Sequence, residues 1–125
     1  MEASQTRDYW VAKDVQLGGV NLLFLMVGVM SKETEAWRFL VRGRVQGVGF
    51  RWFVEREAHI LGIAGWVRNN PDSSVEVLAM GTRDQLAGLR SRLREGPRAA
   101  RVDNVDELEA KPISGLTTFR IEGAW

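Results

Sequence analysis

From residue 36 onward, hydrophobic and polar positions follow the periods of regular secondary structure. Apolar and polar residues alternate over residues 37–42, which places Trp37, Phe39 and Val41 on one face and predicts a half-buried strand. The next apolar residues recur at helical spacing and predict a helix that stops at Gly62; they are Phe50, Phe53, Val54, Ala58 and Leu61. The regular part of the chain therefore opens with a strand, a glycine-containing loop and an amphipathic helix.

The pattern continues to residue 122. A turn at residues 70–73 contains Pro71 and separates two apolar stretches, so a strand is predicted on each side of it. Thr82 can cap a second helix, whose apolar stripe consists of Leu86, Leu89 and Leu93. The predicted strands after the first helix lie at residues 63–69, 74–80, 101–109 and 118–122, the last two with weaker patterns.

The resulting order is βαββαβ, with room for one further strand near the C-terminus. This order is typical of an α+β, ferredoxin-like sandwich, in which an antiparallel sheet carries two helices on one face. We expect the first and third strands to pair at the centre of the sheet. The second strand, at 63–69, is then expected to lie at an edge.

Composition excludes several kinds of chemistry. The chain has 125 residues, enough for one domain with a core of its own. It has no cysteine, which excludes disulfides, thiolate metal sites and a cysteine nucleophile. The single histidine, His59, argues against a multi-histidine metal site, leaves little room for a Ser/His/Asp triad and is expected to face solvent. A formal net charge of +1 does not indicate a polyanionic partner.

The first 35 residues have a different character. They contain an apolar run, residues 20–30, that is short for a membrane span of roughly 20 residues. The run is also a poor signal peptide, because acidic and basic residues are mixed before it. We predict an extension of residues 1–35 outside a domain of residues 36–125, with Met30 as a candidate start. The alternative is a helical anchor or a partner-binding segment.

The loop GRVQGVGFR, residues 43–51, joins the first strand to the first helix. Its three glycines permit positive φ, so that successive N–H groups can converge as an anion-binding nest at the start of a helix. Arg51 lies in the first helical turn, where a positive charge opposes the helix dipole unless a bound anion offsets it. A tight bend with a solvent-facing arginine is the other interpretation. These residues alone leave the two open.

Asn69 ends the predicted second strand. It can simply lead into the turn before Pro71, or its amide can hold a water molecule by donating to it and accepting from it. The chain pattern does not decide whether Asn69 faces the loop.

Together, GRVQGVGFR and GIAGWVRNN (residues 62–70) closely resemble the corresponding motifs of acylphosphatases, and the resemblance covers residues 36–125. It implies hydrolysis of acyl phosphates to a carboxylate and inorganic phosphate, without a metal or cofactor. Arg51 and Asn69 are the implied catalytic residues, Asn69 by positioning the attacking water. The phosphate-binding residues implied are Val45, Gln46, Gly47, Val48, Gly49, Phe50 and Arg51, acting mainly through backbone amides.

The resemblance also implies a small-molecule acyl phosphate as the partner. We further expect a cytoplasmic monomer that binds neither nucleic acid nor membrane. One departure from the family concerns the turn, where Ser73 stands in the place of a usual glycine. A serine fits there only with strain or with a changed turn type.

A non-catalytic ferredoxin-like module that binds phosphorylated metabolites is the rival function, because this fold serves many functions. An RNA-binding module is disfavoured, since the third strand lacks aromatic residues and its Glu76 would repel phosphate. Asn69 discriminates between the remaining two functions, because a pure binder needs no amide to position water.

Overall fold

The computed structural model describes residues 16–17, 20–21 and 33–123. The chain divides into two units, Met1–Glu33 and Thr34–Trp125. In the first unit, β1 (Gln16–Leu17) and β2 (Val20–Asn21) pair as short antiparallel strands. Most of the apolar run at 20–30 lies outside the described residues, and the extension at 1–35 stays a prediction.

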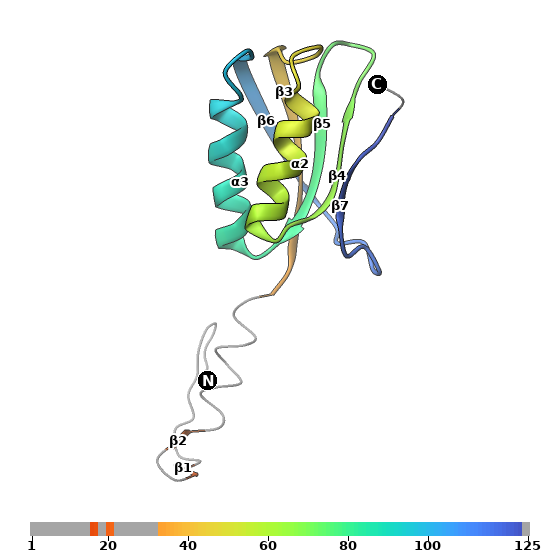
Figure 1. Ribbon diagram of the computed structural model, residues 1–125. Coiled ribbons are helices and arrows are strands. Elements are labelled where there is room, and N and C mark those ends of the chain that lie inside the picture. The colour runs from red at the N-terminus through yellow and green to blue at the C-terminus, as the bar shows by residue number, and fades with distance from the viewer. Residues whose placement is uncertain (1–15, 18–19, 22–32, 124–125) are drawn as a thin grey trace. The chain divides into compact units, whose positions relative to one another are not determined.

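The second unit is a sheet of five strands with two helices on one face (Figure 1). In chain order its elements are β3 (Glu35–Arg44), α2 (Phe50–Leu61), β4 (Ala64–Asn69), β5 (Val75–Gly81), α3 (Arg83–Glu95), β6 (Arg101–Ala110) and β7 (Phe119–Ile121). The predicted α+β, ferredoxin-like architecture is confirmed. None of the helices in the described ranges is long and apolar enough to span a membrane.

The strands lie in the order β6-β3-β5-β4-β7. As predicted, β3 and β5 pair at the centre, and the pairs β6–β3, β3–β5 and β5–β4 are antiparallel. The prediction that the second strand lies at an edge is wrong. The short β7 pairs with β4 in parallel and anchors there through the buried Phe119, so β4 is an interior strand and the sheet is mixed.

Both helices begin or end at the predicted signals. Gly62 adopts a left-handed conformation (φ 76°) and its N–H bonds back to the end of α2. Thr82 caps α3 through a capping box with Gln85, in which each side chain accepts from the other residue's backbone N–H. The leucine stripe of α3 is buried against the same core as the strands, which includes Phe39, Val41, Phe50, Val54 and Val77.

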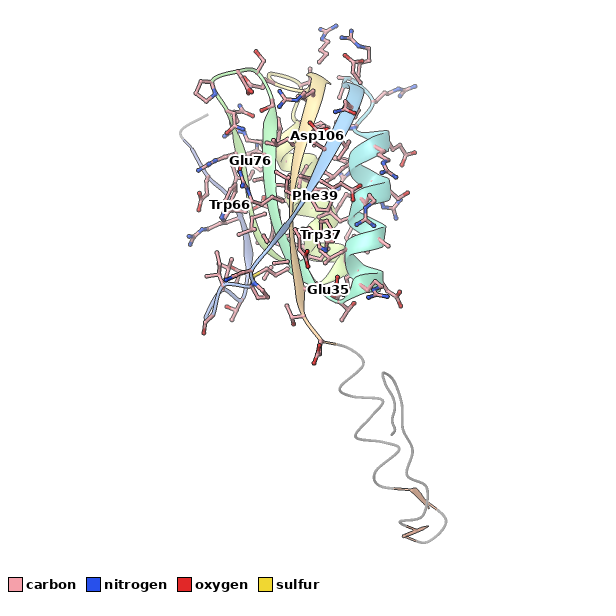
Figure 2. All side chains as sticks on the ribbon, turned by 180° about the vertical axis from the view of Figure 1, so that it is seen from behind. Glu35, Trp37, Phe39, Trp66, Glu76 and Asp106 are labelled. Atoms are coloured by element: carbon pink, nitrogen blue, oxygen red, sulfur yellow. The ribbon has the colours of Figure 1, made fainter. Side chains whose placement is uncertain are left out.

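The opposite face of the sheet carries a charged cluster on its three central strands. Glu76 on β5 is buried and accepts hydrogen bonds from Arg38 on β3 and Arg68 on β4. Arg68 also stacks over Trp66, 4.7 Å from its ring centre. Figure 2 shows Glu76 and Trp66 on neighbouring strands of this face.

The two arginines keep Glu76 ionised. Burial raises the pKa of its carboxyl, but the hydrogen bonds and charges of Arg38 and Arg68 outweigh that effect and lower the pKa below its ordinary value of 4.5. Because the negative charge is neutralised, Glu76 would not repel phosphate in the way expected from the sequence. Glu76 therefore does not disfavour RNA binding, and the absence of nucleic acid as a partner stays a prediction.

Candidate active site

The three glycines of the loop have different structural roles. Gly43 lies at a β-bulge between β3 and β6 with φ 135°, and a Cβ there would lie 2.1 Å from the carbonyl oxygen of Arg101. Gly43 thus permits the close approach of two strands and does not shape the loop, contrary to expectation. Gly47 and Gly49 adopt left-handed conformations (φ 73° and 76°), where a Cβ would meet nothing within 4 Å. They are required for conformation alone, as a nest demands.

Two buried side chains fix the ends of the loop. Val45 and Phe50 are each about 1% exposed and belong to the core, and Val48 packs partly against it. These side chains point into the domain, so only their backbone groups are available to a ligand at the surface. The implied role of residues 45–50 in phosphate binding therefore concerns their amides.

Helix α2 begins at the loop with its N-terminal donors available. Gly49 is the N-cap residue, no side chain among the described residues caps the helix, and its first turn contains no acidic residue. The leading N–H groups of a helix have no intrahelical acceptor, and they carry the positive end of the dipole. An anion is the expected complement of this arrangement.

Arg51 is held in place from the far end of the chain. Its Nη1 donates to the backbone carbonyl of Glu122 at 3.2 Å, just beyond β7. The N–H of Glu122 in turn donates to the carbonyl of Val67 on β4 at 2.8 Å. Arg51 is thereby linked through Glu122 to Val67, which lies two residues before Asn69 in β4.

Asn69 is the last residue of β4 and pairs with Val75 of β5. Its side-chain oxygen Oδ1 is buried and has no hydrogen-bond partner among the residues that the structure describes. Buried polar atoms in proteins are nearly always satisfied, and an exception is a candidate for a functional water or ligand. The strand end is thus suited to hold a small polar molecule.

The loop also contacts the chain immediately after Asn69. The side-chain amide of Gln46 donates to the carbonyl oxygens of Asn70 and Ser74, both at 2.9 Å. The side-chain N–H donors of Gln46 are therefore directed at this turn, and its backbone N–H stays predicted for phosphate. In Figure 1 the loop before α2, the β4–β5 turn and the end of β7 lie at the same end of the sheet.

The β4–β5 turn that receives Gln46 is held by its own hydrogen bonds. The buried Ser74 donates to Asp72 Oδ1 through its hydroxyl at 2.6 Å and through its backbone N–H at 3.0 Å. These bonds, with a smaller contribution from Arg42, lower the pKa of the Asp72 carboxyl below its ordinary value of 3.8. Ser73 keeps a positive φ of 79°, and it is the one non-glycine residue in the described ranges to do so. The strain expected from the missing glycine is present.

Replacing Ser73 by glycine should stabilise the domain. A left-handed conformation costs a residue with a Cβ about 1–2 kcal/mol, and glycine avoids this cost. Part of the benefit is lost, because glycine also gives the unfolded chain more conformational entropy. We expect a net gain of about 0.5–1 kcal/mol in the free energy of unfolding, measured by urea denaturation. Ser73→Ala, which keeps the Cβ, is the control and should gain nothing. A loss of stability in Ser73→Gly would contradict the strain.

The remaining polar candidates lie away from this end or are occupied. His59 is exposed, as predicted, and its Nε2 lies 3.0 Å from the carbonyl oxygen of Phe119. Arg68 is committed to Glu76 and Trp66 and does not extend into the loop. Within the described part of the chain, no group of three or more His, Cys, Asp or Glu residues could hold a metal ion. The expectation of a metal-free reaction stays a prediction.

Two contacts at the site were not predicted from the sequence. Glu122 acts through its backbone carbonyl and Gln46 through bonds to two backbone carbonyls. A carbonyl acceptor is present in every residue, so residue type carried no signal for either contact. The sequence feature that comes closest to indicating the Gln46 contact is a long polar side chain between a valine and a glycine.

Comparison with known proteins places these features in a family. The family model described as acylphosphatase matches residues 37–121. An acylphosphatase of Koribacter versatilis is 58% identical over 96 residues, which cover 77% of this chain and 87% of that protein. One of Rhizobium etli is 44% identical over 94 residues, covering 75% of this chain and the whole of that protein.

The fold agrees with the same family. The crystal structure of acylphosphatase from Bacillus subtilis matches with a TM-score of 0.68 and 37% identity, covering 71% of this chain and 99% of that one. An acylphosphatase from Coxiella burnetii gives a TM-score of 0.67, also with 37% identity, over 71% of this chain and 93% of that one. The chain belongs to the acylphosphatase family.

Proposed function

We propose that this acylphosphatase hydrolyses acyl phosphates with the phosphate held by the backbone amides of residues 45–50 and by Arg51, while Asn69 positions the attacking water. The observation that supports the proposal most directly is the buried Oδ1 of Asn69, which has no hydrogen-bond partner among the described residues. It lies at a strand end that Gln46 links to the loop and Glu122 links to Arg51. The site thus combines an anion-binding nest, a guanidinium and an amide with spare hydrogen-bonding capacity.

The charges suit a phosphate group. Its oxygens would accept hydrogen bonds from the leading N–H groups of the loop and helix α2, where the dipole is positive. The planar guanidinium of Arg51 can donate two parallel hydrogen bonds to the same group. Phosphoryl transfer depends mainly on positioning and on stabilising the charge that spreads over the phosphate oxygens. Both needs are met by donors that the fold fixes in advance.

The reaction then requires only a directed water molecule. The Asn69 amide can accept a hydrogen bond from water through Oδ1 and donate one through Nδ2. The water oxygen attacks phosphorus as the bond between phosphorus and the acyl oxygen breaks, and a carboxylate leaves. The water's proton passes to a phosphate oxygen of the substrate, so no general base is needed. A carboxylate is a good leaving group, so no strong general acid is needed either.

The test is release of inorganic phosphate from acetyl phosphate by the full chain treated with a chelator. We expect saturable hydrolysis at an unchanged rate after chelation. Activity that depends on added magnesium would contradict the metal-free route, and tight phosphate binding without turnover would support a binding module. A version starting at Met30 should hydrolyse acetyl phosphate equally well if residues 1–35 lie outside the fold.

The oligomeric state, cellular compartment and partners form part of the same proposal. We propose a monomer that acts in the cytoplasm on a small acyl phosphate and needs no nucleic acid, membrane or cofactor. The support is that the loop, Arg51 and Asn69 all lie in the one sheet-and-helix unit, Thr34–Trp125.

A further inference from the structure

One side chain joins the two halves of the site. Gln46 lies in the middle of the loop, and its amide nitrogen donates at 2.9 Å to the carbonyl oxygens of both Asn70 and Ser74. A primary amide has two N–H groups, so these two bonds use its full donor capacity. Two carbonyl acceptors also fix which way the amide faces, because only the nitrogen can donate to them.

The turn that accepts these bonds is stiff. The N–H of Asn70 donates to the carbonyl of Ser74 at 2.9 Å, and the N–H of Ser73 donates to the carbonyl of Asn70 at 3.2 Å. The side chain of Asn70 donates to the Ser74 hydroxyl at 3.1 Å, and that hydroxyl donates to Asp72. Gln46 is therefore attached to a closed hydrogen-bonded unit that is continuous with Asn69.

The loop is equally well fixed on its own side. Val45, directly before Gln46, is buried in the core, and Gly47, directly after it, adopts the left-handed conformation that shapes the nest. The amides proposed to bind phosphate, those of residues 45–50, lie on both sides of Gln46, and Asn69 directly precedes the turn. The Gln46 side chain thus spans the gap between the group that would hold phosphate and the group that would hold water.

We propose that Gln46 is a positioning residue that sets the distance between the phosphate-binding loop and the Asn69 amide. This inference rests on the proposed function, because it concerns the alignment of water with a bound phosphate. Reacting atoms must approach to about 3–3.5 Å in line, and a displacement of about 1 Å can cost about 100-fold in rate. Binding of phosphate alone depends on the loop and Arg51, and it needs no alignment with Asn69.

The experiment replaces Gln46 by methionine, which keeps the length of the side chain but has no N–H donor. We expect kcat for acetyl phosphate to fall about 10- to 100-fold. The inhibition constant for inorganic phosphate should change by less than about threefold, which corresponds to about 0.65 kcal/mol. Gln85→Met is the matched control, because it also removes one side chain-to-backbone contact but lies beyond the opposite end of β5. Its kcat should stay close to that of the wild type.

A double-mutant cycle separates positioning from a general structural effect. In an Asn69→Ala background the water is no longer held, so adding Gln46→Met should lower kcat no further. Independent effects would multiply. The inference is overturned if kcat is unchanged in Gln46→Met, if the phosphate inhibition constant rises as much as kcat falls, or if the two losses multiply.

Two further measurements keep the outcome clear. Thermal unfolding shows whether Gln46→Met folds, and Gln46→Leu, which also lacks N–H donors and adds no charge, replaces it if it does not. Failure of the proposed function looks different from failure of this inference. If the proposed function is wrong, the wild type releases no phosphate or Asn69→Ala retains full turnover, and the inference about Gln46 is then also wrong. If only the inference is wrong, the wild type is active, Asn69→Ala is nearly inactive, and the Gln46 variants behave like the wild type.

Discussion

Replacing Arg51 by glutamine should lower kcat/KM for acetyl phosphate by about 10³-fold or more, within the range of about 10³–10⁵ known for arginines that stabilise phosphoryl transfer. The guanidinium is positioned by the Glu122 carbonyl beside β4 and next to the start of α2, so it would contact the phosphate in both the ground state and the transition state. Glutamine removes the positive charge and the planar fork together. Steady-state kinetics over a range of substrate concentrations will separate the effects on kcat and KM.

The stability of Arg51→Gln should change far less than its activity. A positive side chain in the first turn of a helix opposes the dipole, and relief of this opposition offsets part of the loss of the hydrogen bond to the Glu122 carbonyl. We therefore expect the free energy of unfolding to fall by no more than about 1 kcal/mol. Arg56→Gln is the matched control, because Arg56 lies on the same helix and its side chain is mostly exposed. Comparable losses of activity in both variants would contradict a specific role for Arg51.

Replacing Asn69 by alanine should lower kcat by about 10²–10³-fold, the usual effect of losing one preorganised polar group. The inhibition constant for inorganic phosphate should change little, because the nest and Arg51 remain. Removing a buried Oδ1 without a partner among the described residues should also not destabilise the domain. Urea denaturation, together with phosphate-release kinetics, tests both statements.

Asn104→Ala provides the matched control for Asn69. Asn104 is an exposed residue of β6 whose amide bonds to the neighbouring Asp106, so the same substitution there should leave kcat close to the wild type. Full turnover by Asn69→Ala would remove the water-positioning role. Both catalytic candidates thus share a property: each occupies a position that costs the fold something, and each is expected to contribute to catalysis.

Much of the fold follows from local signals in the sequence. Gly62 and Thr82 mark helix ends because their conformations and hydrogen bonds are set by the nearest few residues. The leucine stripe of α3 has one buried face whatever its partner is. The position of β4 was not predictable in the same way, since it depends on β7, a three-residue strand more than 50 residues further along the chain. Short strands carry little pattern of their own.

The candidate site was likewise predictable only where local sequence signals determine it. Residue types and spacing indicated an anion-binding loop at Gly47 and Gly49 and an unusual arginine at 51. They did not distinguish Gly43 from the two loop glycines, because its role depends on the close approach of the neighbouring strand β6. The role of Asn69 came from the family resemblance, because facing the loop is a long-range property. The links through Gln46 and Glu122 end on backbone carbonyls, which no pattern of side chains reveals.

The edge strand β6 has a consequence for how copies of the domain meet. It is ten residues long and lies at one end of the sheet, so its outer backbone groups could template a strand from another molecule. Its acidic residues are Asp103, Asp106, Glu107 and Glu109. Some of these carboxylates already pair with arginines, Asp103 with Arg101 and Glu107 with Arg94. Docking a second strand would have to desolvate or separate such pairs, and charged side chains on an edge strand therefore disfavour edge-to-edge pairing. We therefore expect the charged side chains of β6 to disfavour aggregation of the concentrated protein through this edge.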